Sequence, residues 1–161
     1  MTKLFDPILE LIDAEFRGKS WNGLSFLPTL EKLTAKEAAD GNTWEGYSAW
    51  EIALHCAMCK RIVAKDLGLA VPDWPYPEGV WFPAPADQGE ASWARDKALL
   101  VELHEASMRA LRGMDEAVLE SEMPSWKAPW KQVLVWLTTH DSFHGAQIRS
   151  MGLPALREKK H

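Results

Sequence analysis

Cysteine is almost absent from this chain of 161 residues: only Cys56 and Cys59 occur, too few for a disulfide framework. Such a chain suits a reducing compartment, so we expect it in the cytoplasm. Long apolar runs are absent as well, and none approaches the ~18 residues of a membrane span. Because Asp6, Glu10 and Asp13 interrupt the apolar beginning, we expect neither a secretory signal nor a membrane partner.

An excess of basic charge is also missing, since 18 lysines and arginines face 23 aspartates and glutamates, for a net charge of −5. Neutralisation of phosphates by basic side chains supplies much of the affinity for nucleic acid, so we expect no nucleic-acid partner. Alternating strand patterns and internal repeats are not found. The length suits a single domain over residues 1–161 with a substantial core.

What the sequence does contain is helical periodicity, interrupted by helix-stop signals. It predicts four long helices, the first capped by Asp6 before Pro7, the second opened by a capping box. The expected ranges are Asp6 to Gly18, Ser48 to Gly68, Asp87 or Glu90 to Gly113, and Pro129 to Met151. The fold class is therefore all-α, most simply a four-helix bundle.

Two connections have a character of their own. Thr34 to Glu37 reads as a capping box and predicts a short extra helix in the first connection. Residues 71–89 contain five prolines, which exclude regular structure, together with four aromatic residues. This proline- and tryptophan-rich crossover loop is either an apolar flap that closes the bundle end or part of a lid over a site.

Helical phase assigns a direction to the polar side chains. His55 faces inward with the apolar residues of its helix, whereas Lys60 falls on the opposite side. Asp141 also faces away from the histidine side, so we expect at most a surface contact. Glu105 and Arg109 are expected to form a surface pair.

Two histidines, His140 and His144, lie four residues apart on the apolar face of the last helix. Burial of two imidazoles is costly unless both find partners, and side chains at this spacing can share one ion. His55, on the inward face of another helix, is the natural third ligand. The three histidines together predict a divalent metal site, with neutral imidazole nitrogens as donors.

Several other chemistries lack their motifs. H-D-S-F-H is not the H-E-x-x-H of zinc proteases, and none of the four predicted helices carries the E-x-x-H of di-iron bundles. The C-A-M-C of Cys56 to Cys59 lies in mid-helix, away from the helix N-terminus that would lower a thiol pKa, so two apolar fillers are expected. Cys59 nevertheless follows His55 by four residues and stays open as a thiolate ligand. His104 is expected to be a core histidine, or else a partner of the ligands.

The motifs together resemble the DinB/YfiT-like superfamily of metalloenzymes. The resemblance covers nearly the whole chain and rests on S-A-W-E-I-A-L-H, H-D-S-F-H-G-A-Q-I-R and L-T-A-K-E-A-A-D-G. It implies a four-helix bundle with a three-histidine site, in which His55, His140 and His144 bind nickel or zinc and Gln147 matches the family's glutamine. It also implies a homodimer and enzymes that use low-molecular-weight thiols as cosubstrates.

Three functions remain open. The first is a metal-dependent transferase that moves a thiol onto a small-molecule electrophile, and the second is a hydrolase that uses metal-bound hydroxide. The third is a non-catalytic stress or small-molecule-binding protein. A water at the fourth coordination position favours catalysis, and a fourth protein ligand favours a structural metal. Because no residue stands out as a general base, we assign no catalytic residue.

Overall fold

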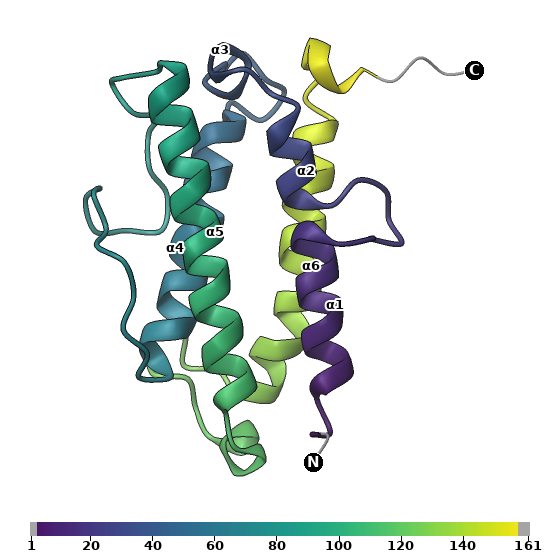
Figure 1. Ribbon diagram of the computed structural model, residues 1–161, viewed down its shortest axis with the longest axis vertical. Coiled ribbons are helices and arrows are strands. Elements are labelled where there is room, and N and C mark those ends of the chain that lie inside the picture. Colours follow the sequence, from purple (N-terminus) through teal and green to yellow (C-terminus); the bar gives the residue numbers. More distant parts are fainter. Residues whose placement is uncertain (1–2, 158–161) are drawn as a thin grey trace.

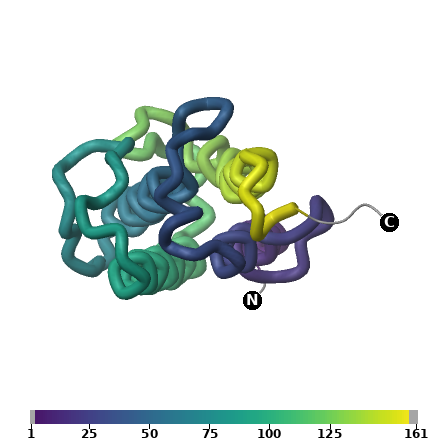
Figure 2. Tube along the Cα trace, turned by 90° about the horizontal axis from the view of Figure 1, so that it is seen from above, coloured from purple at the N-terminus to yellow at the C-terminus, as the bar shows by residue number. Residues whose placement is uncertain are grey.

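The computed structural model describes residues 3–157, and these confirm the all-α class: they contain helices and a single isolated bridge, Glu122 with Pro129, but no β-strand. Four long helices lie side by side (Figures 1 and 2). They are α1 (Asp6–Arg17), α4 (Ala49–Asp66), α5 (Glu90–Gly113) and α6 (Trp130–Arg149). The shorter ones are α2 (Phe26–Glu31), α3 (Ala35–Ala38), η1 (Glu116–Glu120) and η2 (Pro154–Leu156).

The helices follow the sequence signals with two exceptions, one at a helix end and one in the number of short helices. Both capping boxes form, at Thr34 and at Ser48, with the side-chain and backbone bonds of each box present. The prediction that Asp6 caps α1 was wrong, because Phe5 occupies that position and the Asp6 carboxylate instead accepts a bond from the Lys3 backbone at 2.7 Å. The first connection also holds two short helices, α2 and α3, where one was expected.

The four long helices are arranged as two pairs. α4 packs mainly along α5, and α1 packs mainly along α6, so that the pairs face each other in Figure 1. Large side chains such as Phe16, Phe26 and Trp50 fill the space between them and are fully buried. Contacts between α4 and α6 are sparse by comparison, and the predicted histidines lie on these two helices.

Two polar side chains contradict their predicted outward positions, and a third has a different partner from the one predicted. Lys60 and Asp141 are both buried and paired with each other, and Glu105 pairs with Arg17 of α1 instead of Arg109. The reason for the buried pair is that α6 contacts α1, α2 and α4, so its buried face is wider than one apolar stripe. A side chain one residue from a core position then still faces a neighbouring helix.

The crossover loop divides its aromatic side chains between core and surface. Phe82 is buried and Trp74 and Tyr76 pack against the same core, whereas Trp81 stays partly exposed beside His55. Within residues 3–157, none of the helices combines the length and apolarity needed to cross a membrane.

Candidate metal centre

The three predicted histidines meet between α4 and α6. His55 lies in the second turn of α4, and His140 and His144 are one turn apart on α6. One ring nitrogen of each histidine lies within 4.8 Å of the others, and the Nε2 atoms of His55 and His140 are 3.4 Å apart. Two nitrogens bound to one tetrahedral zinc ion at ~2.1 Å would be about 3.4 Å apart. The spacing therefore fits an ion between them.

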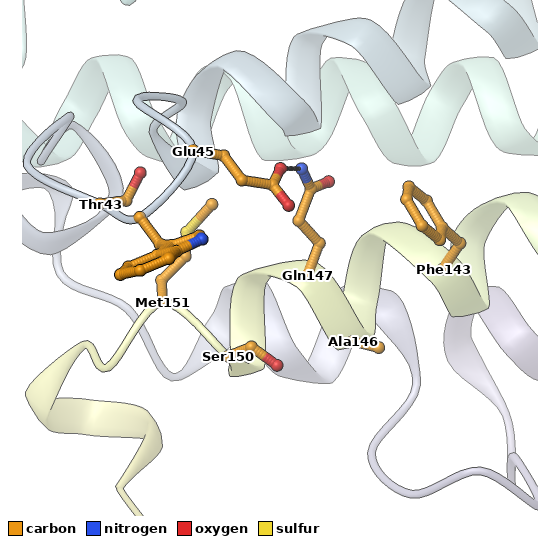
Figure 3. Close-up of a pocket in the computed structure, with 8 residues that line it drawn as sticks. Thr43, Glu45, Phe143, Ala146, Gln147, Ser150 and Met151 are labelled. Atoms are coloured by element: carbon orange, nitrogen blue, oxygen red, sulfur yellow. Dashed lines mark hydrogen bonds between the residues drawn. The ribbon is translucent and has the colours of Figure 1, made fainter.

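Outer hydrogen bonds fix the direction of two of the imidazoles. Nδ1 of His55 donates to the Val80 carbonyl oxygen at 2.6 Å, so its Nε2 carries the free lone pair. Nδ1 of His144 lies 2.8 Å from Oε1 of Gln147. The Gln147 amide nitrogen in turn donates to the Glu45 carboxylate, as Figure 3 shows.

The carboxylate of Glu45 decides the protonation of His144. A carboxylate can only accept, so the amide nitrogen of Gln147 must face Glu45 and its oxygen must face the histidine. Nδ1 of His144 is then the protonated nitrogen, and Nε2 is left to bind an ion. Such outer partners are typical of metal-bound histidines.

His140 has a buried carboxylate beside it. Its Nδ1 lies 3.7 Å from Oδ1 of Asp141, an oxygen that is buried without a hydrogen-bond partner, while Oδ2 accepts from the Lys60 ammonium at 2.6 Å. Lys60 and His140 hold the pKa of Asp141 well below its usual range, although burial opposes them. The carboxylate is therefore charged and stands behind His140, away from the other two rings.

Burial keeps two of the candidate ligands, His55 and His144, in their neutral, donor form. It is the main cause that lowers the pKa of His144 to about 4, with further lowering by His140. Burial also lowers the pKa of His55, against the opposing bond to Val80. At neutral pH both rings are uncharged and ready to coordinate a cation.

A cavity of about 320 Å³ opens onto the three histidines. Thr139 and three aromatic side chains complete its lining: Trp81, Trp136 and Phe143. Trp81 stacks on His55 with ring centroids 4.1 Å apart and planes within 6°, and Tyr47 stacks on the far side of Trp81. Trp81 is thus the aromatic side chain of the crossover loop that packs directly on a candidate ligand, while a lid function stays a prediction.

A second group of potential ligands lies deeper. Atoms of Cys56, His140 and Asp141 also come within 4.8 Å of one another. The Lys60 ammonium already neutralises this carboxylate, and burial raises the pKa of the Cys56 thiol well above its ordinary value. A cation would gain neither a free carboxylate nor a thiolate there, so the three-histidine group is the better metal site.

The two cysteines and His104 lie in the core. Both cysteines are buried, as expected of apolar fillers, and burial raises the pKa of Cys59 to about 12, although its Sγ lies 3.8 Å from Nε2 of His55. His104 is a core histidine: it is fully buried and hydrogen-bonded to Asp13 at 2.9 Å, away from the ligands.

Sequence reasoning missed several contributors to this site. Trp136 precedes His140 by four residues and so continues the ridge of the histidine pair, a signal that was present in the sequence. Phe143 offers no ligand atom, so its place beside His144 gave no signal of a role in the cavity wall. The Val80 carbonyl leaves no mark in a sequence, because every residue has one, and Glu45 comes from a loop of unpredictable path.

Comparison with known proteins identifies no relative: no protein-family model, curated protein or solved structure matches this chain. Function must therefore be argued from the site itself.

Proposed function

We propose that this protein is a metal-dependent enzyme that binds one divalent ion, nickel or zinc, through His55, His140 and His144. The observation that carries the proposal is the convergence of the three rings, with outer acceptors at Nδ1 of His55 and His144. Without an ion, Nε2 of His140 can donate its proton to Nε2 of His55 across the 3.4 Å between them. A divalent cation in that position would replace the proton and be bound by both nitrogens.

The reaction that we favour is transfer of a low-molecular-weight thiol to a small-molecule electrophile. A divalent ion held by His55, His140 and His144 would have room for a further ligand, and it would favour the deprotonated form of a thiol bound there, whose proton would pass to solvent. The protein's own residues provide the rest: Trp81 covers His55, and the cavity beside the ligands admits a small molecule. The resemblance to the DinB/YfiT-like superfamily points to the same chemistry and to the same type of four-helix bundle.

Metal analysis of protein purified without an affinity tag tests the central claim. We expect about one nickel or zinc ion per wild-type chain and less than a tenth of that in His140→Ala. His104→Ala is the matched control, since this histidine is buried outside the site, and it should keep its ion. A wild-type chain that neither carries nor takes up an ion would overturn the proposal.

A panel of electrophiles with cellular thiols then tests the reaction. Turnover that requires both the ion and a thiol supports the transferase, whereas turnover without a thiol points to the hydrolase alternative. The specific observation in favour of a non-catalytic protein is Cys59, whose Sγ lies 3.8 Å from Nε2 of His55. If Cys59→Ala lowers zinc affinity as strongly as His140→Ala does, the ion has a fourth protein ligand and is structural.

Two further parts of the proposal are the oligomeric state and the location. We propose a homodimer, on the family resemblance, which sedimentation velocity at micromolar concentration would test. We also propose the cytoplasm, because both cysteines are free thiols. Fractionation of cells that express the protein would test that assignment.

A further inference from the structure

Each of the three histidines is flanked by an aromatic ring of the cavity wall. Trp81 lies against His55, Trp136 against His140 at 4.3 Å between centroids, and Phe143 against His144 at 5.1 Å. These rings come from the crossover loop and from α6, so the wall is built by two separate parts of the chain. The open side of the histidine cluster is therefore surrounded by aromatic surface.

All three aromatic rings of the cavity wall are substantially exposed. Trp81 and Trp136 are each 40% exposed and Phe143 is 63% exposed. Scattered apolar residues on a surface need no explanation, but these three gather around one cavity that also holds a candidate metal site. A ligand that covered them would gain the hydrophobic and stacking contributions that the free protein lacks.

The absence of charged side chains among the described residues of the cavity lining limits the kind of ligand that the cavity can bind. In the part of the chain that the structure describes, no lysine, arginine, aspartate or glutamate lines it, and Thr139 supplies the only hydroxyl. The nearby carboxylates stand behind the histidines. Asp141 lies 3.7 Å from Nδ1 of His140 and is paired with Lys60. Glu45 bonds to Gln147 (Figure 3), which in turn bonds to His144. A charged group on the part of a ligand that lies against the aromatic rings would lose its hydration and find no counter-charge in that wall, because the proposed ion offers its charge only to the donor atom that coordinates it.

We propose that the cavity binds an uncharged aromatic molecule that reaches the ion through a single donor atom. This assignment rests on the proposed metal site and names the class of molecule that the site accepts. The volume of about 320 Å³ admits a ring with a short substituent, and aromatic walls recognise a ring by stacking and edge contacts. Specificity comes from Trp81, Trp136 and Phe143, and the histidines act only through the ion.

Calorimetric titration of zinc-loaded protein with three thiols tests the proposal. Phenylmethanethiol carries the ring without a charge, 2-mercaptoethanol lacks the ring, and 4-(mercaptomethyl)benzoate adds a carboxylate to it. We expect phenylmethanethiol to bind about tenfold more tightly than either of the others. Trp136→Ala and Phe143→Ala should each remove most of that preference while zinc stays stoichiometric.

The control is Trp21→Ala, which removes a tryptophan that is 94% exposed and outside the cavity wall. It should leave the preference unchanged. Equal affinity for the three thiols in protein shown to hold zinc would overturn the aromatic assignment without touching the metal site, whereas absence of zinc would overturn the proposed function itself. If the two alanine variants change only the sedimentation coefficient and not the preference, a second copy of the chain covers the wall and the proposal is wrong.

Discussion

Replacement of Lys60 by methionine should destabilise the protein strongly. The Lys60 ammonium lies 2.6 Å from Oδ2 of Asp141 and 4.8 Å from the centre of the Phe16 ring, and both partners of the ion pair are almost inaccessible to solvent. Methionine keeps most of the apolar stem but leaves a carboxylate buried without its counter-charge. Breaking a buried pair in this way costs about 3–5 kcal/mol, a large share of the ~5–15 kcal/mol that stabilises a domain.

Urea denaturation of metal-free protein at pH 7 measures this cost, with a surface pair as the control. Lys131 and Glu120 are also 2.6 Å apart but well exposed, so Lys131→Met should cost only about 0–1 kcal/mol. The double variant Lys60→Met/Asp141→Leu should recover much of the loss, because an apolar pair needs no compensation. Equal, small losses for Lys60→Met and Lys131→Met would refute the argument from burial.

The same variant should also respond to acid. In the wild type the pKa of Asp141 is lowered below its unfolded value, so its contribution is present at neutral pH and is lost as the pH falls toward and below ~4. Without Lys60, only His140 still opposes the effect of burial, so the pKa of this carboxyl rises and its protonation on acidification relieves the cost. The difference in stability between wild type and Lys60→Met should therefore shrink as the pH is lowered.

Three further predictions concern other residues. Glu45→Ala should weaken zinc binding about tenfold in a chelator competition, because Gln147 loses the acceptor that orients it, whereas Thr43→Ala in the same loop should not, since its hydroxyl bonds to Tyr47. Burial lowers the pKa of His104 to about 4, so on acidification the unfolded chain takes up a proton at this histidine before the folded chain does. The free energy of unfolding of the metal-free protein should therefore fall by up to about 3 kcal/mol between pH 6.5 and 4. A His104→Leu variant whose stability has the same pH profile would contradict this. Both cysteines should resist iodoacetamide at pH 8 until urea is added, as mass spectrometry would show, because burial raises the pKa of Cys59 to about 12; rapid alkylation of the native protein would refute it.

The parts of the fold that were predictable from sequence are those with local causes. The capping boxes at Thr34 and Ser48 act within four residues, so the beginnings of α3 and α4 could be located correctly. The inward direction of His140 and His144 followed from one helix alone. In contrast, the burial of Asp141 depends on Lys60 in α4, 81 residues away, and no periodicity within α6 carries that information.

The candidate site also has one part that was predictable from local sequence and one part that was not. Its ligands were visible as an i,i+4 pair with one further inward histidine, but the groups that orient them were not. A backbone carbonyl at Val80 and a loop carboxylate at Glu45 take their places through the paths of irregular segments. Chain composition says little about such paths, because many loop conformations have similar free energies.

The bond from His55 to the Val80 carbonyl joins a proposed metal ligand to the backbone of the crossover loop. The orientation of His55 then depends on the position of residues 71–89. Ion binding and closure of this loop are therefore thermodynamically coupled. If the closed loop strengthens ion binding by a given free energy, the bound ion stabilises the closed loop by the same free energy. The position of the proline-rich segment should therefore report whether the ion is bound. Its rate of cleavage by a protease should fall when the ion binds. The factor of that decrease should equal the factor by which closure of the loop strengthens ion binding.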